Sequence, residues 1–468
     1  MKFVKYTGKA VMISALLFLF SCASYHQQSY DYYSNLKQGN YQKASTRLDH
    51  NRLLQKKRNR LLFLLEKGRV EHLLQNFEKS NEYFNAADSM MEGLRTSAKD
   101  IVLGTLLNPM MQTYQGEDFE KYMVHYYKAL NYLQLNNTEE ALVEARRISL
   151  RTYAQDDRYD GNRYTQDAFS FILQSLIYEK AGDLNNAFIA CRNAADLYME
   201  HNEEFYGTKM PMQLKKDLLR LAWQNGFIEE LEWYESRFQL KCERNEIKDD
   251  EVVIFWENGT APVKKEEHLF FTLGGNGNDQ LFFQDQTGRY RVPYDQRQGT
   301  LSGKISETHT FHVALPRYET QVPVYQNAFV TIDGKQFELE KAQNINELAY
   351  ATLQERWLKE LSSTLSRMAV KKLAEEAAKP KKDEKDHKKK QRAELLSSGI
   401  KVFNLFSEKA DTRNWQSLPN SIYYTRIAVP KGTNQIDLNL DQRNGTNTKR
   451  EILLKNKGRL QLYNISTQ

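Results

Sequence analysis

The chain has 468 residues, of which 40% are hydrophobic and 27% are charged. Its length allows roughly two to four domains of about 100–200 residues each, and its mean hydropathy of -0.70 excludes a protein that crosses a membrane many times. The formal net charge of +6 is assigned to three lysines before residue 10 and to the Lys379–Arg392 run, with a nearly neutral remainder. A nucleic-acid surface spread over the chain is therefore not expected, and no nucleic-acid partner is predicted.

The first residues have the pattern of an export signal. Three lysines precede the apolar run Ala10–Phe20, which is about half as long as the ~20 residues that a membrane-spanning helix needs. The next residues, Leu19–Cys22 (LFSC), resemble the lipobox of bacterial lipoproteins, in which the cysteine thiol is diacylated and the chain is cut before it. Phe20 departs from that pattern, because a small residue is usual at its position.

The lipobox predicts that residues 1–21 are a signal peptide cut between Ser21 and Cys22, and that Cys22 carries diacylglycerol and acyl chains. No other cofactor and no metal is expected. Ala23 follows the cysteine where Asp would retain the protein in the inner membrane, so we expect the outer membrane of a Gram-negative bacterium, with the protein facing the periplasm. Two alternatives stay open: an ordinary signal peptide with an incidental cysteine, and a short uncleaved anchor.

After a tether over residues 22–29, residues 30–245 predict a degenerate array of tetratricopeptide-repeat-like (TPR-like) helix pairs. Small residues recur at positions 44, 80, 141 and 187, where the two helices of a pair cross; their spacings of 36, 61 and 46 residues compare with an ideal repeat of about 34. A fifth pair around Gly226 has a weaker pattern. The residues assigned to this packing are Gly39, Ala44, Gly68, Ser80, Phe84, Ala129, Tyr132, Ala141, Tyr178, Gly182, Ala187 and Ala194.

Such an array builds an extended concave surface that binds peptides or proteins, so we expect a protein partner there. A plain helical bundle is the alternative. Cys191 falls at a packed helix position, whereas Cys242 follows the last helix and is expected to be exposed. The two thiols are candidates for a disulfide only if their geometry allows it.

The second half of the chain is rich in strands. Residues 250–342 form the first part of a β-rich domain, in which Asp333-Gly334 predicts a two-residue hairpin. Residues 343–409 read as a helical insertion that contains the lysine-rich segment, and residues 410–468 supply the last strands. The fold class is therefore α+β: an N-terminal TPR-like array followed by a β-sandwich-like domain with a helical insertion. Two small β units joined by helices are the alternative.

Motifs that would indicate catalysis are missing from the sequence. There is no HExxH or GxSxG, and the glycine cluster Gly274–Asp279 lacks the Lys-Ser/Thr of a phosphate-binding loop. His309 and His312 should point to opposite faces of a strand. Carboxylate pairs such as Glu139-Glu140 and Glu229-Glu230 fit exposed helix faces. We therefore predict that the protein is not an enzyme, with a cryptic hydrolase built on two facing carboxylates as an alternative.

The Lys379–Arg392 run is favoured as a solvated loop. Contact with anionic lipid head groups or polysaccharide is an alternative reading for a membrane-tethered protein.

Several blocks of sequence, in the expected order, resemble a family of bacterial TPR-containing lipoproteins. They are EDFEKYMVHYYKALNYL (117–133) with EALVEARR (140–147), WENGTAPVK (256–264), VALPRY (313–318) and ADTRNWQSLPNSIYYTRIAVPKG (410–432). Genes of that family tend to lie near genes for other envelope lipoproteins, including ones that resemble activators of peptidoglycan synthases. The resemblance therefore implies a scaffold or assembly role in the cell envelope, linked to cell-wall synthesis.

A rival resemblance is to the TPR-containing nutrient-binding lipoproteins of outer-membrane glycan transporters. Residues 23–33 lack the segment that usually follows the cysteine in those proteins, and a β domain like this one is unusual among them. The sequence thus predicts a non-catalytic lipoprotein with an envelope protein partner, and leaves its oligomeric state open. An exposed aromatic platform on the β domain would favour glycan binding instead, and two carboxylates with shifted pKa values would favour a hydrolase.

Overall fold

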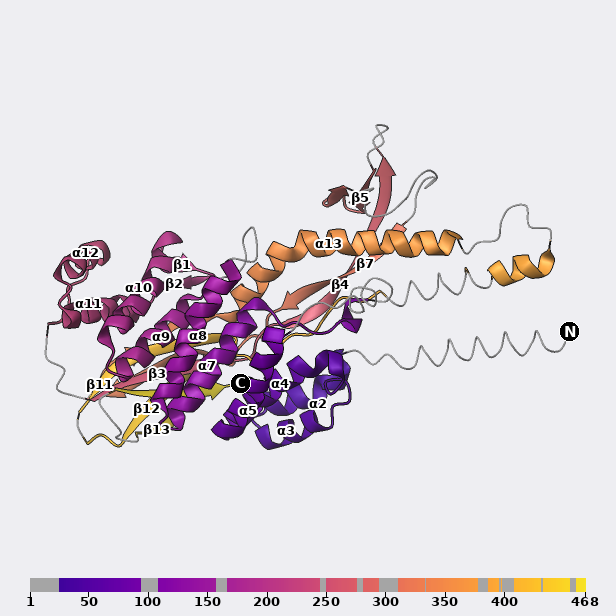
Figure 1. The fold of residues 1–468 in the computed structure, drawn as a ribbon. Helices are drawn as coiled ribbons and strands as arrows, with labels where there is room; N and C mark the ends of the chain where they lie inside the picture. Colours follow the sequence, from indigo (N-terminus) through magenta and orange to yellow (C-terminus); the bar gives the residue numbers. More distant parts are fainter. Residues whose placement is uncertain are drawn as a thin grey trace.

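The computed structural model describes residues 25–93, 108–156, 166–244, 250–275, 281–293, 310–332, 334–377, 386–394, 397, 408–430, 432–454 and 460–468. The expected mixture of helices and sheets is confirmed: a helical array is followed by three four-stranded sheets and one long helix (Figure 1). Among these residues, none of the helices combines the length and the apolar character that crossing a bilayer requires.

The described residues contain five stacked helix pairs. The pairs are α2 (Tyr25–Lys37) with α3 (Tyr41–Asp49), α4 (Arg60–Leu73) with α5 (Phe77–Gly93), α7 (Asp118–Gln134) with α8 (Thr138–Asp156), α9 (Ala168–Lys180) with α10 (Leu184–Glu200), and α11 (Met212–Asn225) with α12 (Ile228–Phe238). The second helix of each pair packs on the first helix of the next pair. This is TPR-like stacking, and the weakly indicated fifth pair around Gly226 is part of it.

The tether assigned to residues 22–29 is wrong from Tyr25 onward. Helix α2 begins at Tyr25, and the side chains of Tyr25 and Ser29 are buried. The Tyr25 hydroxyl lies 2.8 Å from that of Tyr33, so the first turn is held in the protein core. Any tether after Cys22 is therefore no longer than residues 22–24.

The strands form three separate sheets. The inner sheet has the order β10 (Glu340–Asn344), β11 (Ser421–Val429), β3 (Asp250–Asn258), β14 (Leu460–Thr467). The outer sheet has the order β13 (Asn447–Leu453), β12 (Gln435–Gln442), β8 (Tyr325–Ile332), β9 (Lys335–Glu338). The arm sheet has the order β6 (Arg291–Pro293), β5 (Leu281–Asp285), β4 (Val263–Gly275), β7 (Thr310–Glu319). Neighbouring strands are antiparallel, except that β14 runs parallel to β3. A short hairpin, β1 (Glu204–Phe205) with β2 (Thr208–Lys209), lies between α10 and α11.

The inner sheet is buried on both faces because its central strand is apolar at every second position on each side. Val253 and Phe255 of β3 belong to the core shared with the helical array. The alternating residues Val252, Ile254 and Trp256 belong to a second core shared with the outer sheet. Helices, inner sheet and outer sheet are therefore three successive layers.

The arm sheet departs from the expected single β-sandwich with a helical insertion. Its strands β4, β5, β6 and β7 pack instead against the long helix α13 (Ile345–Ala377). Their shared core contains Phe271, Phe283 and Phe311 from the sheet, and Leu361 and Leu365 from α13. Figure 1 shows β5 and the far end of β4 standing away from the body of the molecule.

Candidate functional site

The chain makes the same kind of turn between the two helices of all five pairs. Equivalent positions can therefore be counted from this turn in every pair. A residue with left-handed backbone ends the first helix of each pair: Gly39, Gln75, Asn136, Gly182 and Gly226, with φ between +59° and +84°. In each case the left-handed residue's N–H donates to the carbonyl three residues back, and the N–H of the following residue donates to the carbonyl four residues before the left-handed one. This is the Schellman arrangement. Positions counted from these residues are equivalent along the array.

The residues assigned to helix packing lie at matching positions in this register. Five residues after the turn stand Ala44, Ser80, Ala141 and Ala187, all buried. Gly68 and Ala129 stand seven residues before the turn residue, on the first helix of the second and third pairs. Where α4 and α5 cross, the Ser80 hydroxyl donates to the Gly68 carbonyl at 2.7 Å. Of the others, Phe84, Tyr178 and Ala194 are buried and Tyr132 is partly buried, whereas Ser21 and Cys22 lie outside the described residues.

The inner face of the array, made by the first helix of each pair, is covered by the protein's own inner sheet. Tyr126 of α7 and Phe169 of α9 both meet the Phe255 ring, with centroids 6.4 and 5.9 Å away. Lys180 donates to the Leu460 carbonyl of β14 at 2.8 Å, and the Glu340 carboxylate of β10 accepts from the first backbone N–H groups of α11. The expected open concave surface is therefore wrong for this face.

Buried ion pairs fasten the sheet to the array. Arg69 of α4 lies 2.5 Å from Glu257 of β3, and neither side chain is exposed. Arg426 of β11 pairs with Glu179 of α9 at 2.6 Å and with Asp217 of α11 at 2.9 Å. Burial raises the pKa of Glu179, but Arg426 and Arg220 outweigh it and lower the pKa to about 2. A buried cation without its anion strongly destabilises a folded protein. These pairs therefore fix the position of the inner sheet on the array.

A row of exposed apolar side chains follows the outer face of the array. Val143, Ile189 and Trp233 each stand seven residues after the left-handed turn residue, on α8, α10 and α12, with 43%, 36% and 55% of their surface exposed. The same position holds exposed Thr46 and Glu82 in the first two pairs. Equivalent positions of stacked repeats form a line, so the last three pairs present one apolar outer row. We did not predict it, although the register makes it readable from the sequence.

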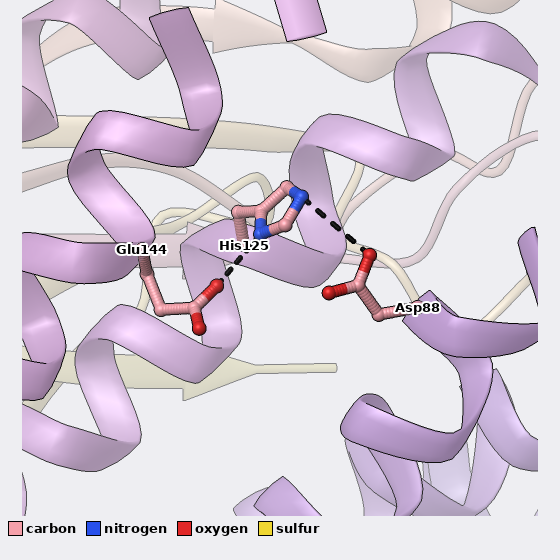
Figure 2. A group of neighbouring side chains, drawn as sticks. All are labelled: Asp88, His125 and Glu144. Atoms are coloured by element: carbon pink, nitrogen blue, oxygen red, sulfur yellow. Dashed lines mark hydrogen bonds and ion pairs between the residues drawn. The ribbon is translucent and has the colours of Figure 1, made fainter. Parts of the chain in front are cut away.

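Helices α5, α7 and α8 also hold a buried acid–imidazole cluster, shown in Figure 2. His125 of α7 lies 2.7 Å from Glu144 of α8 through Nδ1 and 3.8 Å from Asp88 of α5 through Nε2. These three residues could supply ligands to a metal ion. However, the Lys128 ammonium lies 3.2 Å from Asp88 and 2.8 Å from Glu144, and Arg147 also pairs with Asp88. Two cations already balance the two carboxylates, so the residues fit an ion network that joins three helices better than a divalent metal.

A second pair of buried carboxylates, Glu117 and Glu120, begins helix α7. Burial and the Glu117 charge raise the pKa of Glu120 to about 7. Burial alone would raise the pKa of Glu117 as well, but Lys264 and Arg356 outweigh it and lower that pKa to about 2. Such a divergent pair is the pattern we associated with a hydrolase.

The contacts of this pair are structural. Glu120 accepts hydrogen bonds from the backbone N–H of Trp415 at 2.8 Å and of Glu117 at 2.9 Å, the second of which caps α7. Glu117 is held by Lys264 of β4 and Arg356 of α13. Because both side chains are buried and bound by the protein's own groups, the pair fits an anchor between array, arm and the segment before β11.

The arm sheet carries an aromatic and imidazole surface on the side away from α13. The His312 ring lies 5.1 Å from the Phe270 ring and 5.0 Å from the His268 ring, and His312 Nε2 is 3.1 Å from His268 Nδ1. Phe270 is 44% exposed. This is the kind of platform that we associated with glycan binding. His309, which we expected on the opposite face from His312, lies outside the described residues.

The two cysteines of the helical array and the lysine-rich run are the remaining candidates. Cys191 is buried and Cys242 partly buried, and both thiols are free. Burial raises the pKa of the Cys191 thiol far above its ordinary value, so that thiol is not reactive. Of the Lys379–Arg392 run, residues 386–392 are described; they are exposed, and residues 387–394 are helical rather than a loop.

Comparisons with known proteins report three helical-repeat structures. No family model and no curated protein matches the chain significantly. The first structure is MamA, with 13% sequence identity over 45% of this chain and 87% of MamA and a TM-score of 0.28. The second is a Rap protein complexed with Competence and Sporulation Factor, with 17% identity over 47% of this chain and 56% of the Rap chain and a TM-score of 0.29. The third is a putative kinesin light chain of Podospora anserina with nearly identical TPR-like repeats, with 12% identity over 46% of this chain and 99% of that chain and a TM-score of 0.31. At these TM-scores the TPR-like assignment depends on the helix-pair geometry described above.

Proposed function

We propose that this protein is a non-catalytic, lipid-anchored envelope scaffold that binds a protein partner of the periplasm or outer membrane. The anchor is the acylated Cys22, and the role in envelope assembly follows from the family that the sequence resembles. The observation that carries the proposal is the outer row of Val143, Ile189 and Trp233. Because the inner face of the array is filled by the inner sheet, a partner is bound on the outer face.

The chemistry of the outer row favours a partner with an extended apolar stripe. Its three side chains increase in size from Val143 to Trp233, and exposed tryptophan is a frequent centre of binding energy in protein interfaces. Buried hydrophobic area along three successive repeats would give such a partner affinity and a fixed direction. The first two pairs, with Thr46 and Glu82 at the row position, offer no such contact.

Site-specific photocrosslinking in living cells tests this proposal. A photoreactive residue is placed at Val143, Ile189 or Trp233, and the equivalent positions Thr46 and Glu82 serve as matched controls. We expect one and the same envelope protein to be captured from the three row positions and not from the controls. Equal capture from all five positions, or capture of no envelope protein, would overturn the proposal.

The same partner, once captured, allows a quantitative test. Trp233→Glu should weaken its binding about 30-fold or more, since loss of a central aromatic costs roughly 2 kcal/mol or more. Glu82→Gln should change the affinity less than about two-fold. The affinity of both purified variants is compared by titration, with circular dichroism to show that the array is folded.

A second candidate function, glycan binding, is supported by the arm sheet. The Phe270–His312–His268 surface offers an exposed ring of the kind that stacks on sugars. Titration of the protein with envelope oligosaccharides, compared with Phe270→Ala, discriminates the two functions, because the outer row lies on other elements.

A further inference from the structure

The connection between α3 and α4 is a concentrated cationic surface, here called the cationic loop. Residues 52–60 (RLLQKKRNR) contain five basic and no acidic residues. Arg52, Lys56, Lys57 and Arg60 are exposed. Within the part of the chain that the structure describes, none of these four has a carboxylate oxygen within 4.0 Å. Their charges are therefore available to an external anion.

The neighbouring helices add to this charge. Residues 25–60 contain eight basic and two acidic residues, a net charge of +6. Both acidic residues have partners of their own: Asp31 lies 4.0 Å from Arg47, and Asp49 lies 2.9 Å from Lys67. The first helix pair and the cationic loop thus carry as much net positive charge as the whole chain.

The cationic loop lies at the beginning of helix α2. Asn51, the residue before the loop, donates from Nδ2 to the Gln28 carbonyl at 3.2 Å and lies 3.4 Å from the Ser29 hydroxyl. Both of these partners belong to the first two turns of α2. In Figure 1, α2, α3 and α4 form one end of the array, and α12 forms the other.

Chain length places this end of the array at the membrane. Cys22 is three residues before Tyr25, and consecutive Cα atoms are about 3.8 Å apart. The acylated residue of the proposed function therefore lies within about 11 Å of the start of α2. This is close to the distance of about 8 Å over which surface charges act at physiological ionic strength.

We infer that the cationic loop is a second membrane contact, which binds the anionic phospholipid head groups of the leaflet that holds the acyl chains. This inference rests on the proposed lipid anchoring at Cys22. A lipid anchor alone leaves the body free to swivel, whereas an anchor beside a polybasic surface holds one end of the array against the bilayer. The end with Trp233 then points away from the membrane, toward a periplasmic partner.

Vesicle binding by the unlipidated mature chain, carrying Cys22→Ser, tests the inference without the acyl chains. We expect binding to vesicles that contain about one third phosphatidylglycerol, weakening steeply with salt, and no binding to phosphatidylcholine alone. The triple variant Arg52→Gln, Lys56→Gln, Lys57→Gln should bind the anionic vesicles about 100-fold more weakly, at a factor of about five per charge.

A variant with the same change in charge elsewhere is the matched control. Lys388→Gln, Lys389→Gln, Lys390→Gln removes three exposed charges from the lysine-rich segment and should retain affinity within about three-fold. Equal loss in both triple variants, no loss in the first, or binding to neutral vesicles would overturn the inference. Circular dichroism shows that all variants are folded.

Failure of the anchor is measured separately. Cell fractionation of Cys22→Ala with a high-salt wash reports lipidation, because an acylated chain stays with the membrane after the wash, whereas the electrostatic head-group contact of this variant should be released. If Cys22→Ala stays in the membrane after the wash while the cationic loop still binds anionic vesicles, the proposed anchor is wrong and the head-group contact stands. If Cys22→Ala is released from the membrane while the cationic loop does not bind anionic vesicles, the head-group contact is wrong and the anchor stands.

Discussion

Gly68 shows how little space remains where two helices of a pair cross. A Cβ atom built at this position would lie 2.7 Å from the Phe84 ring, and the Ser80 hydroxyl already occupies the Gly68 carbonyl. Glycine therefore permits the close approach of α4 and α5. This need outweighs the weak helix propensity of glycine, which would otherwise favour alanine by about 1 kcal/mol.

Gly68→Ala should for this reason lower the free energy of unfolding by about 1–3 kcal/mol, the usual cost of an overpacked core. Gly93→Ala is the control, because Gly93 ends α5 with no atom within 4 Å of its built Cβ; it should be neutral or stabilising by up to about 1 kcal/mol. Urea unfolding measures both. A Gly68→Ala protein as stable as the parent would show that the crossing can widen without cost.

His72 should make the array sensitive to acid. Its Nδ1 donates to Asn131 at 2.6 Å, and burial, followed by the nearby Arg69 charge, lowers the pKa of His72 to about 4. An unfolded histidine binds a proton near its ordinary pKa of about 6.5. Between these two values the unfolded chain takes up a proton that the folded chain does not.

The free energy of unfolding should therefore fall as the pH drops from about 6.5 to 4, by up to about 3 kcal/mol from His72. His72→Gln should remove this part of the pH dependence while other groups keep theirs. Urea unfolding of both proteins at several pH values gives the difference. Parallel curves for the two proteins would contradict the assignment.

At the scale of elements, local patterns were predictable and distant pairings were not. The helix pairs could be inferred because each depends on a left-handed turn such as Gly182 and on small residues that cross nearby in sequence. The strands followed from alternation, but their grouping did not: nothing near β4 indicates that it leaves β3 for a separate sheet with α13. The start of α2 at Tyr25 was missed because its buried partner comes later in the chain: the Tyr32 and Tyr33 hydroxyls both donate to the Glu66 carboxylate at 2.7 Å.

The distance between contacting residues in the sequence also explains which features of the candidate site were predicted wrongly or missed. We expected an open concave surface because array sequences alone do not reveal what covers them. The strands that cover it are more than 180 residues from Arg69, whose side chain reaches Glu257. The cationic loop was overlooked because the buried Leu53 and Leu54 interrupt its charges, and folding is needed to place the loop at one end of the molecule.

At the scale of the whole molecule, the array and the inner sheet are built around one core. They share a hydrophobic cluster, and buried pairs such as Arg69–Glu257 and Arg426–Glu179 cross the boundary that we expected near residue 245. We therefore expect a single thermal transition in calorimetry, with equal calorimetric and van't Hoff enthalpies for the array and the inner sheet. Two separated transitions would show that the helical half is stable without the sheet.

The parallel pairing of β14 with β3 has a consequence for the time course of folding. The Trp256 indole N–H donates to the Thr467 hydroxyl across 211 residues of chain, whereas each helix pair closes over a few residues at its turn. Contacts so distant in sequence form slowly, because the chain loses much entropy in meeting. We therefore expect the helix pairs to form first and the inner sheet to assemble on them last. Until it does, their apolar inner face is exposed to solvent, which favours aggregation or binding by a chaperone.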